Sequence, residues 1–171
     1  MQFCDIVGFS TYYEVEGNSF YKYYDNINDE HWIRIKNVAR ILSNEGLGPK
    51  VFSITDDNNY HCIEYQRITP FNAHNDKIRP NMSTKKIRDK ISSLVDRLHS
   101  LGYGHGDLHL ENIGFQDDTL YILDHDTIYR IEEGQVKWLL LWMKKGFGWE
   151  DSFEDFVEDD YDSWMSDWIC K

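Results

Sequence analysis

Apolar and polar residues alternate over short stretches of the first third of the chain, and this period predicts strands. Residues 11–16 and 18–24 are rich in β-branched and aromatic side chains, with a turn signal at Gly17 between them. Residues 51–54 and 60–65 have the same character on either side of an Asp-Asp-Asn-Asn turn. We therefore expect two pairs of strands in this part of the chain.

A helical period replaces the alternation at two places. Apolar residues recur at three- and four-residue spacing over 35–42, where Asn28 can cap the helix and Gly46 can end it. A second amphipathic helix is expected from about Thr84 to Gly102. Its apolar stripe consists of Ile87, Ile91, Leu94, Val95 and Leu98.

The order of these elements predicts an α+β protein with two parts. Strand, strand, helix, strand, strand make up residues 1–66, and the helix-rich remainder is residues 67–171. Prolines and asparagines punctuate the chain just after this boundary. One small domain, or two small lobes, fits the length of 171 residues.

Composition narrows the classes of partner. The chain has 30 acidic and 18 basic residues, a net charge of −12, which argues against a nucleic acid or an anionic membrane as the main partner. Cys4, Cys62 and Cys170 are odd in number and far apart, so a reducing, cytoplasmic compartment is expected. No signal-peptide pattern is visible, and the longest apolar stretch, 138–143, is too short to span a bilayer.

Acidic residues are concentrated at the end of the sequence. Residues 150–171 hold nine of the carboxylates and a single lysine. Aromatic and aliphatic residues recur among them at near-helical spacing: Phe153, Phe156, Val157, Trp164 and Trp168. The pattern predicts a closing helix with its acid in water, and an acidic docking surface for a basic partner is the alternative.

Candidate chemistry lies in the segment that follows the second helix. Glycines at 102, 104 and 106 prevent the helix from continuing, so Asp107 falls on a loop, with Asn112 five residues later. Asp124 follows an apolar strand, 121–123. Carboxylate and amide oxygens gathered on loops suit Mg²⁺ and phosphate chemistry. Lys22, on a separate strand, is either an exposed edge residue or a cation that neutralises phosphates.

The spacing His105-x-Asp107-x-x-x-x-Asn112, followed by an aspartate that closes a later strand, resembles the catalytic centre of the protein-kinase-like superfamily. Leu98-His99 resembles the end of the helix that precedes the catalytic loop in that superfamily. The resemblance covers roughly residues 1–130. It implies a two-lobed protein-kinase-like fold with an antiparallel-sheet N-lobe, residues 1–66, and a truncated helical C-lobe, residues 67–171.

The resemblance also implies roles for individual residues. Asp107 would be the catalytic base, Asn112 and Asp124 would bind Mg²⁺, and Lys22 would hold the α- and β-phosphates of ATP. Further nucleotide-binding roles would fall to Gly8 and Ser10 in a phosphate loop, to the backbone of Glu64, Tyr65 and Gln66 at the adenine, and to Glu30 as the partner of Lys22. His105 would brace the loop.

Two departures from the common kinase pattern indicate an atypical branch. Gly106 replaces the arginine that often follows the loop histidine, and Asp124-His125-Asp126 replaces Asp-Phe-Gly. Both resemble RIO-like kinases and aminoglycoside or choline phosphotransferases. We expect an ATP- and Mg²⁺-dependent phosphotransferase acting on a hydroxyl, with protein serine or threonine slightly ahead of a small molecule. A pseudokinase scaffold is the alternative, and the short C-lobe suggests an activating protein partner.

Overall fold

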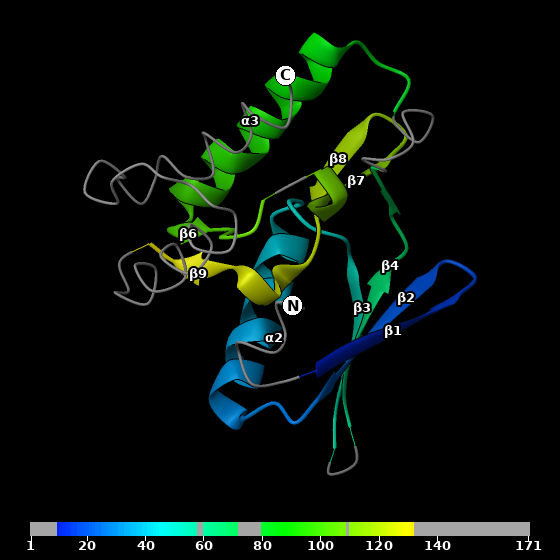
Figure 1. Ribbon diagram of the computed structural model, residues 1–171, viewed down its shortest axis with the longest axis vertical. Coiled ribbons are helices and arrows are strands. Elements are labelled where there is room, and N and C mark those ends of the chain that lie inside the picture. The colour runs from blue at the N-terminus through cyan, green and yellow to red at the C-terminus, as the bar shows by residue number, and fades with distance from the viewer. Residues whose placement is uncertain (1–9, 58–59, 72–79, 109, 132–171) are drawn as a thin grey trace, which may run out of the picture. The chain divides into compact units, whose positions relative to one another are not determined.

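The computed structural model describes residues 10–57, 60–71, 80–108 and 110–131, which divide into two compact units, residues 1–68 and 69–171 (Figure 1). The division falls after Ile68, two residues beyond the expected boundary. Within the described residues, no helix is long and apolar enough to cross a membrane. The expectations for Gly8, for 138–143 and for the acidic closing helix concern residues outside the described part.

The first unit is built on a four-stranded antiparallel sheet. Its strands are β1 (Ser10–Glu16), β2 (Ser19–Asp25), β3 (Val51–Asp56) and β4 (His61–Gln66), in the order β1-β2-β4-β3. The alternating pattern predicts all four within a residue or two. The expected mixed α+β class with an antiparallel sheet in the N-terminal part is thus confirmed.

Helix α2 (Asp29–Asn44) lies across one face of this sheet (Figure 1). The predicted cap is confirmed, because the Asn28 side chain accepts a hydrogen bond of 2.9 Å from the His31 backbone N–H. Such a cap satisfies a backbone donor that the first helical turn leaves without an intrahelical partner. Two acidic residues follow the cap, which suits the positive end of the helix dipole.

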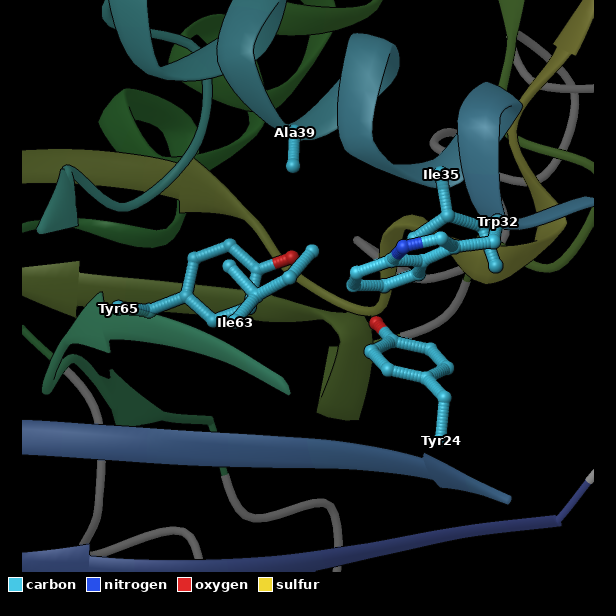
Figure 2. Close-up of a cluster of buried hydrophobic side chains, with 6 residues drawn as sticks. All are labelled: Tyr24, Trp32, Ile35, Ala39, Ile63 and Tyr65. Carbon is cyan, nitrogen blue, oxygen red and sulfur yellow. The ribbon is translucent and has the colours of Figure 1, made fainter. Parts of the chain in front are cut away.

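Aromatic and aliphatic side chains fill the space between α2 and the sheet (Figure 2). The cluster consists of Tyr24, Trp32, Ile35, Ala39, Ile63 and Tyr65. The rings of Tyr24 and Trp32 lie 5.4 Å apart at a tilt of 50°. Ala39 is small enough to let the helix approach Tyr65 and Ile63, as the close-up shows. Burial of large apolar groups here positions β2 and β4, and hence Lys22 and Glu64.

The described residues of the second unit form one long helix and three short pairings of strands. Its elements are β5 (Thr69–Pro70), α3 (Thr84–Ser100), β6 (Tyr103–Gly104), η1 (Leu110–Asn112), β7 (Ile113–Gln116), β8 (Thr119–Ile122), η2 (His125–Thr127) and β9 (Tyr129–Arg130). Strands β5, β7 and β8 form one antiparallel sheet, and β6 pairs with β9. Ser83 caps α3, its hydroxyl accepting from the Lys86 N–H at 3.3 Å.

The β6–β9 pair brackets the segment that carries the candidate chemistry. Tyr103 pairs with Arg130 and Gly104 with Tyr129. A side chain at position 104 would overlap the ring of Tyr129, so glycine is required there by close approach. This contact fixes both ends of the segment 105–128 at one place in the unit.

Adding a methyl group at position 104 should therefore destabilise the second unit. For Gly104→Ala we expect a loss of about 1–3 kcal/mol in the free energy of unfolding, because overpacking displaces the ring. Urea unfolding of the full chain measures it. In a Tyr129→Leu background the same substitution should cost much less. An equal cost in both backgrounds would show that the ring is not the cause.

Candidate active site

A loop closed by a side chain lies between β6 and β7. The Asn112 amide donates to the Asp107 carbonyl oxygen at 2.8 Å and reaches the Asp107 carboxylate at 3.4 Å. Asn112 is buried and Asp107 is half-buried. The two residues that the sequence singles out at five-residue spacing are therefore in direct contact, and the amide holds the carboxylate in place.

His105 braces this loop from within the unit. Its ring is fully buried, and its Nδ1 accepts from the Asp107 backbone N–H at 3.3 Å. The ring proton therefore sits on Nε2, which donates to the carbonyl oxygen of Leu123 at 2.9 Å. The hydroxyl of Thr127 lies 3.3 Å from Nδ1. The imidazole joins the start of the loop to the segment after β8.

Leu123, the residue before Asp124, makes two backbone hydrogen bonds. Its carbonyl oxygen accepts from His105 Nε2, and its N–H donates to the Asn112 carbonyl at 2.8 Å. Leu123 is thus hydrogen-bonded to His105 and Asn112, the two ends of the loop. Because Asp124 is the next residue, its backbone is tied to the loop that carries Asp107 and Asn112. All three residues belong to the second unit.

Asp124 has an unusual backbone. Its φ of 51° and ψ of 70° place it in the left-handed region, which side chains with a Cβ rarely adopt. Aspartate tolerates this conformation better than most residues. Strained backbone of this kind concentrates at functional sites, where the surrounding structure compensates for its cost.

Gly106 gives a physical reason for one departure from the kinase pattern. Its φ is 77°, so a side chain at this position would be strained. Gly106 is also buried between His105 and Asp107. The local conformation of this loop thus favours glycine where many protein kinases carry arginine.

The segment after Asp124 is buried. His125, Asp126 and Thr127 form the short helix η2, and His125 Nε2 lies 3.2 Å from the Ile122 carbonyl oxygen. The sequence did not reveal the part played by Thr127, since a single threonine carries no pattern. The Leu123 backbone was missed for the same reason, because any residue can supply those two groups.

The donor set fits Mg²⁺ in chemical type. Two carboxylates and an amide oxygen are hard ligands, and Mg²⁺ in phosphate-transfer sites takes few protein ligands beside phosphate oxygens. Among the described residues, no group of three or more His, Cys, Asp or Glu side chains is arranged to hold a metal ion. The Mg²⁺-binding roles expected for Asn112 and Asp124 stay predictions.

In the first unit, Lys22 lies on the face of β2 that α2 covers. It is half-buried, shares this face with Phe20 and Tyr24, and its Nζ lies 5.6 Å from the centre of the Tyr24 ring. Glu30, the expected partner of Lys22, lies exposed in the first turn of α2. On α2, Lys36 forms an ion pair with Asp56 of the sheet.

Glu64 lies on the opposite face of the sheet. Its carboxylate accepts from the Ser19 hydroxyl at 2.7 Å, the Ser53 hydroxyl at 2.9 Å and the Tyr21 hydroxyl at 3.3 Å. Hydrogen bonds to the charged form, first that of Ser19 and then that of Ser53, lower the pKa of Glu64. A carboxylate with three hydroxyl donors was not foreseen, because the donors come from two other strands, β2 and β3.

The backbone from Glu64 to Gln66 lies in the ladder of the central strand. β4 pairs with β2 on one side and β3 on the other, and the Gln66 N–H donates to the Lys50 carbonyl at 2.7 Å. The adenine-binding role expected for Glu64, Tyr65 and Gln66 stays a prediction. The Gln66 N–H, for one, already has a protein acceptor. Ser10 is the first residue of β1.

The lowered pKa of Glu64 predicts how the stability of the protein changes in acid. A carboxyl group whose folded pKa lies below its unfolded value stabilises the protein above the unfolded pKa, and this contribution is lost as pH falls through the folded pKa. Glu64→Gln should therefore lower the unfolding midpoint at about pH 7, and the difference from wild type should shrink below about pH 4.

Thermal unfolding of both proteins across this pH range measures the difference. Ser19→Ala removes the closest donor to Glu64. It should reduce the pH dependence of the unfolding midpoint in the wild-type chain but not in the Glu64→Gln variant. A difference between Glu64→Gln and wild type that stays constant from about pH 7 to pH 3 would contradict the assignment.

Neither family models nor curated proteins give a match to this chain. The function is therefore argued from the chemistry of the site itself.

Proposed function

We propose that the protein is a phosphotransferase that uses ATP and Mg²⁺ to phosphorylate a hydroxyl group, with protein serine or threonine favoured over a small molecule. The observation that carries the proposal is the double attachment of Leu123 to His105 and Asn112, which keeps Asp124 beside the loop of Asp107. The kinase-like resemblance of the sequence supports the same reaction.

Each residue has a definite task in this reaction. The Asp107 carboxylate orients the acceptor hydroxyl and takes its proton as the oxygen attacks the γ-phosphorus. The bond from the γ-phosphorus to the bridging oxygen breaks, and ADP leaves with the electron pair. The hydrogen bond from Asn112 holds the Asp107 side chain toward the acceptor, so little reorganisation is needed at the moment of transfer.

Asn112 and Asp124 would hold Mg²⁺, which neutralises the charge on the phosphates. Lys22 keeps the phosphate-binding role that the resemblance implies. A lysine that is half-buried beside an aromatic ring loses part of its hydration, and phosphate oxygens would replace it. Because the backbone of Asp124 is left-handed, its side chain does not continue the alternation of the strand that precedes it.

Removal of either carboxylate should abolish the reaction. Asp107→Asn and Asp124→Asn keep the size of each side chain, and asparagine tolerates the left-handed backbone at 124. We expect each to lower the rate of γ-phosphate transfer from labelled ATP by about a hundredfold or more. The readouts are self-labelling, generic protein acceptors and a panel of small-molecule alcohols and aminoglycosides.

Asp117→Asn is the matched control. Asp117 is an exposed aspartate in the β7–β8 turn, also has a left-handed backbone, and should tolerate the change with full activity. Wild-type rates in both Asp107→Asn and Asp124→Asn would refute the proposed site.

Nucleotide binding can be tested apart from turnover. Excess ATP with Mg²⁺ should raise the unfolding temperature of the wild-type chain, because a ligand at a hundredfold excess over its dissociation constant stabilises by about 2.7 kcal/mol. Lys22→Met and Asp124→Asn should each diminish the shift. A shift without phosphate transfer to any acceptor would favour the pseudokinase scaffold, and the lack of any shift would argue against a nucleotide site.

A further inference from the structure

The face of the first-unit sheet that points away from α2 has a composition of its own. The register brings Tyr12 opposite Tyr23, Glu14 opposite Tyr21, and Tyr21 opposite Glu64, so these residues share one face. With Glu16 and Asp25, which follow at alternate positions, they form what we call the acidic tyrosine face. Tyr24, Ile63 and Tyr65 point to the other face, toward α2 (Figure 2).

Charges are separated between the two faces. The acidic tyrosine face carries four carboxylates, those of Glu14, Glu16, Asp25 and Glu64, and among the described residues of the four strands no lysine or arginine lies on it. Lys22 is on the opposite face. Two cations flank the end of the sheet at Gln66. Lys50 precedes β3 and its Nζ lies 5.9 Å from the centre of the Phe52 ring, and Arg67 follows β4 and its guanidinium donates to the Gly17 carbonyl at 3.4 Å.

Three tyrosine rings form a cluster on this face. Tyr12 and Tyr23 stack face to face at 4.7 Å with an angle of 6° between the rings, and Tyr60 packs against Tyr23 at 5.9 Å with a tilt of 55°. Tyr12 and Tyr60 are 45% and 41% exposed. The Tyr23 hydroxyl donates to Glu14 at 3.3 Å, so a carboxylate lies at the edge of the tyrosine cluster.

This arrangement suits a guanidinium group. Arginine stacks its planar head on aromatic rings and donates to carboxylates in a fork, whereas lysine is a compact and strongly hydrated charge. Alternate positions of a strand are about 6.7 Å apart, which is the spacing of Tyr12, Glu14 and Glu16 along β1. An extended segment with arginine at alternate positions therefore matches the exposed tyrosine rings and the carboxylates beside them.

We propose that the acidic tyrosine face docks an arginine-rich, extended segment of a protein partner. The complementary charge belongs to another molecule, since the longest part of this chain outside the described residues, 132–171, has 11 acidic and four basic residues. The proposal does not depend on phosphate transfer, and its test uses no nucleotide.

The test is fluorescence anisotropy of the full-length protein with a labelled peptide of alternating serine and arginine. We expect saturable binding that weakens as salt is raised, and weaker binding of the serine–lysine peptide of equal charge. Glu14→Gln with Glu16→Gln should raise the dissociation constant about fivefold. Tyr12→Val, which keeps a strand-forming residue, should raise it about threefold.

Neighbouring residues supply matched controls. Tyr13 is next to Tyr12 but belongs to the other face and is 70% exposed, so Tyr13→Val should leave binding unchanged. Glu45→Gln with Asp96→Asn removes two exposed charges elsewhere and should have little effect. Equal losses in test and control variants, or equal affinity for the arginine and lysine peptides, would overturn the proposal.

A measurement on the wild-type chain avoids any failure of a variant to fold. The arginine peptide should slow nitration of Tyr12 by tetranitromethane while Tyr13 reacts at its original rate, as mass spectrometry of digests would show. Unprotected Tyr12 at saturating peptide would place the binding elsewhere and refute the docking face.

Discussion

The candidate active site depends on one buried imidazole. His105 has no exposed surface, and its two nitrogens bind the Asp107 N–H and the Leu123 carbonyl, which lie far apart in sequence. A buried polar group is costly unless its hydrogen bonds are made, so the loop and the strand end must both stay in register with the ring. Thr127 adds a third polar contact at Nδ1. Removing this ring would remove the hydrogen bonds through which one side chain joins the Asp107 N–H to the Leu123 carbonyl, directly before Asp124.

Two left-handed residues flank this hydrogen-bonded link. Gly106 turns the chain between the imidazole and Asp107, and Asp124 turns it immediately after Leu123. Glycine adopts the conformation without steric cost, whereas at Asp124 it costs on the order of 1 kcal/mol or more. Hydrogen bonds on both sides of Leu123 can offset that cost.

Local sequence signals were enough to predict the longer helices and strands, but not the two-residue strands β5, β6 and β9. The alternation of apolar and polar residues predicted β1 and β2, and Asn28 and Gly46 predicted the limits of α2. Strand alternation and helix capping can be read from the sequence because both act within a few residues. The spacing of Asp107 and Asn112 singled out both residues, but the hydrogen bond between them was not predicted. The mixed α+β class is confirmed, while the kinase-like lobes and the roles of the site residues stay proposals.

What could not be predicted comes from pairings between distant segments. Glu64 collects hydroxyls from β2 and β3, and their register is set by the whole sheet. Glu30 was expected to be the partner of Lys22 from its position in a helix. The helix phase leaves Glu30 exposed while Trp32 and Ile35 face the sheet, because a helix turns by about 100° per residue. The pairing with Lys22 stays a prediction.

The register of β2 determines both proposed sites in the first unit. Lys22 points toward α2, while its neighbours Tyr21 and Tyr23 point to the acidic tyrosine face. A slip of one residue would exchange the faces, placing a lysine among carboxylates and two tyrosines in the core. Burial of Tyr24 against Trp32 prevents this slip, since the exchange would expose that large ring. The apolar core therefore stabilises the unit and, through the same contacts, keeps a cation on one face and a cation-binding surface on the other.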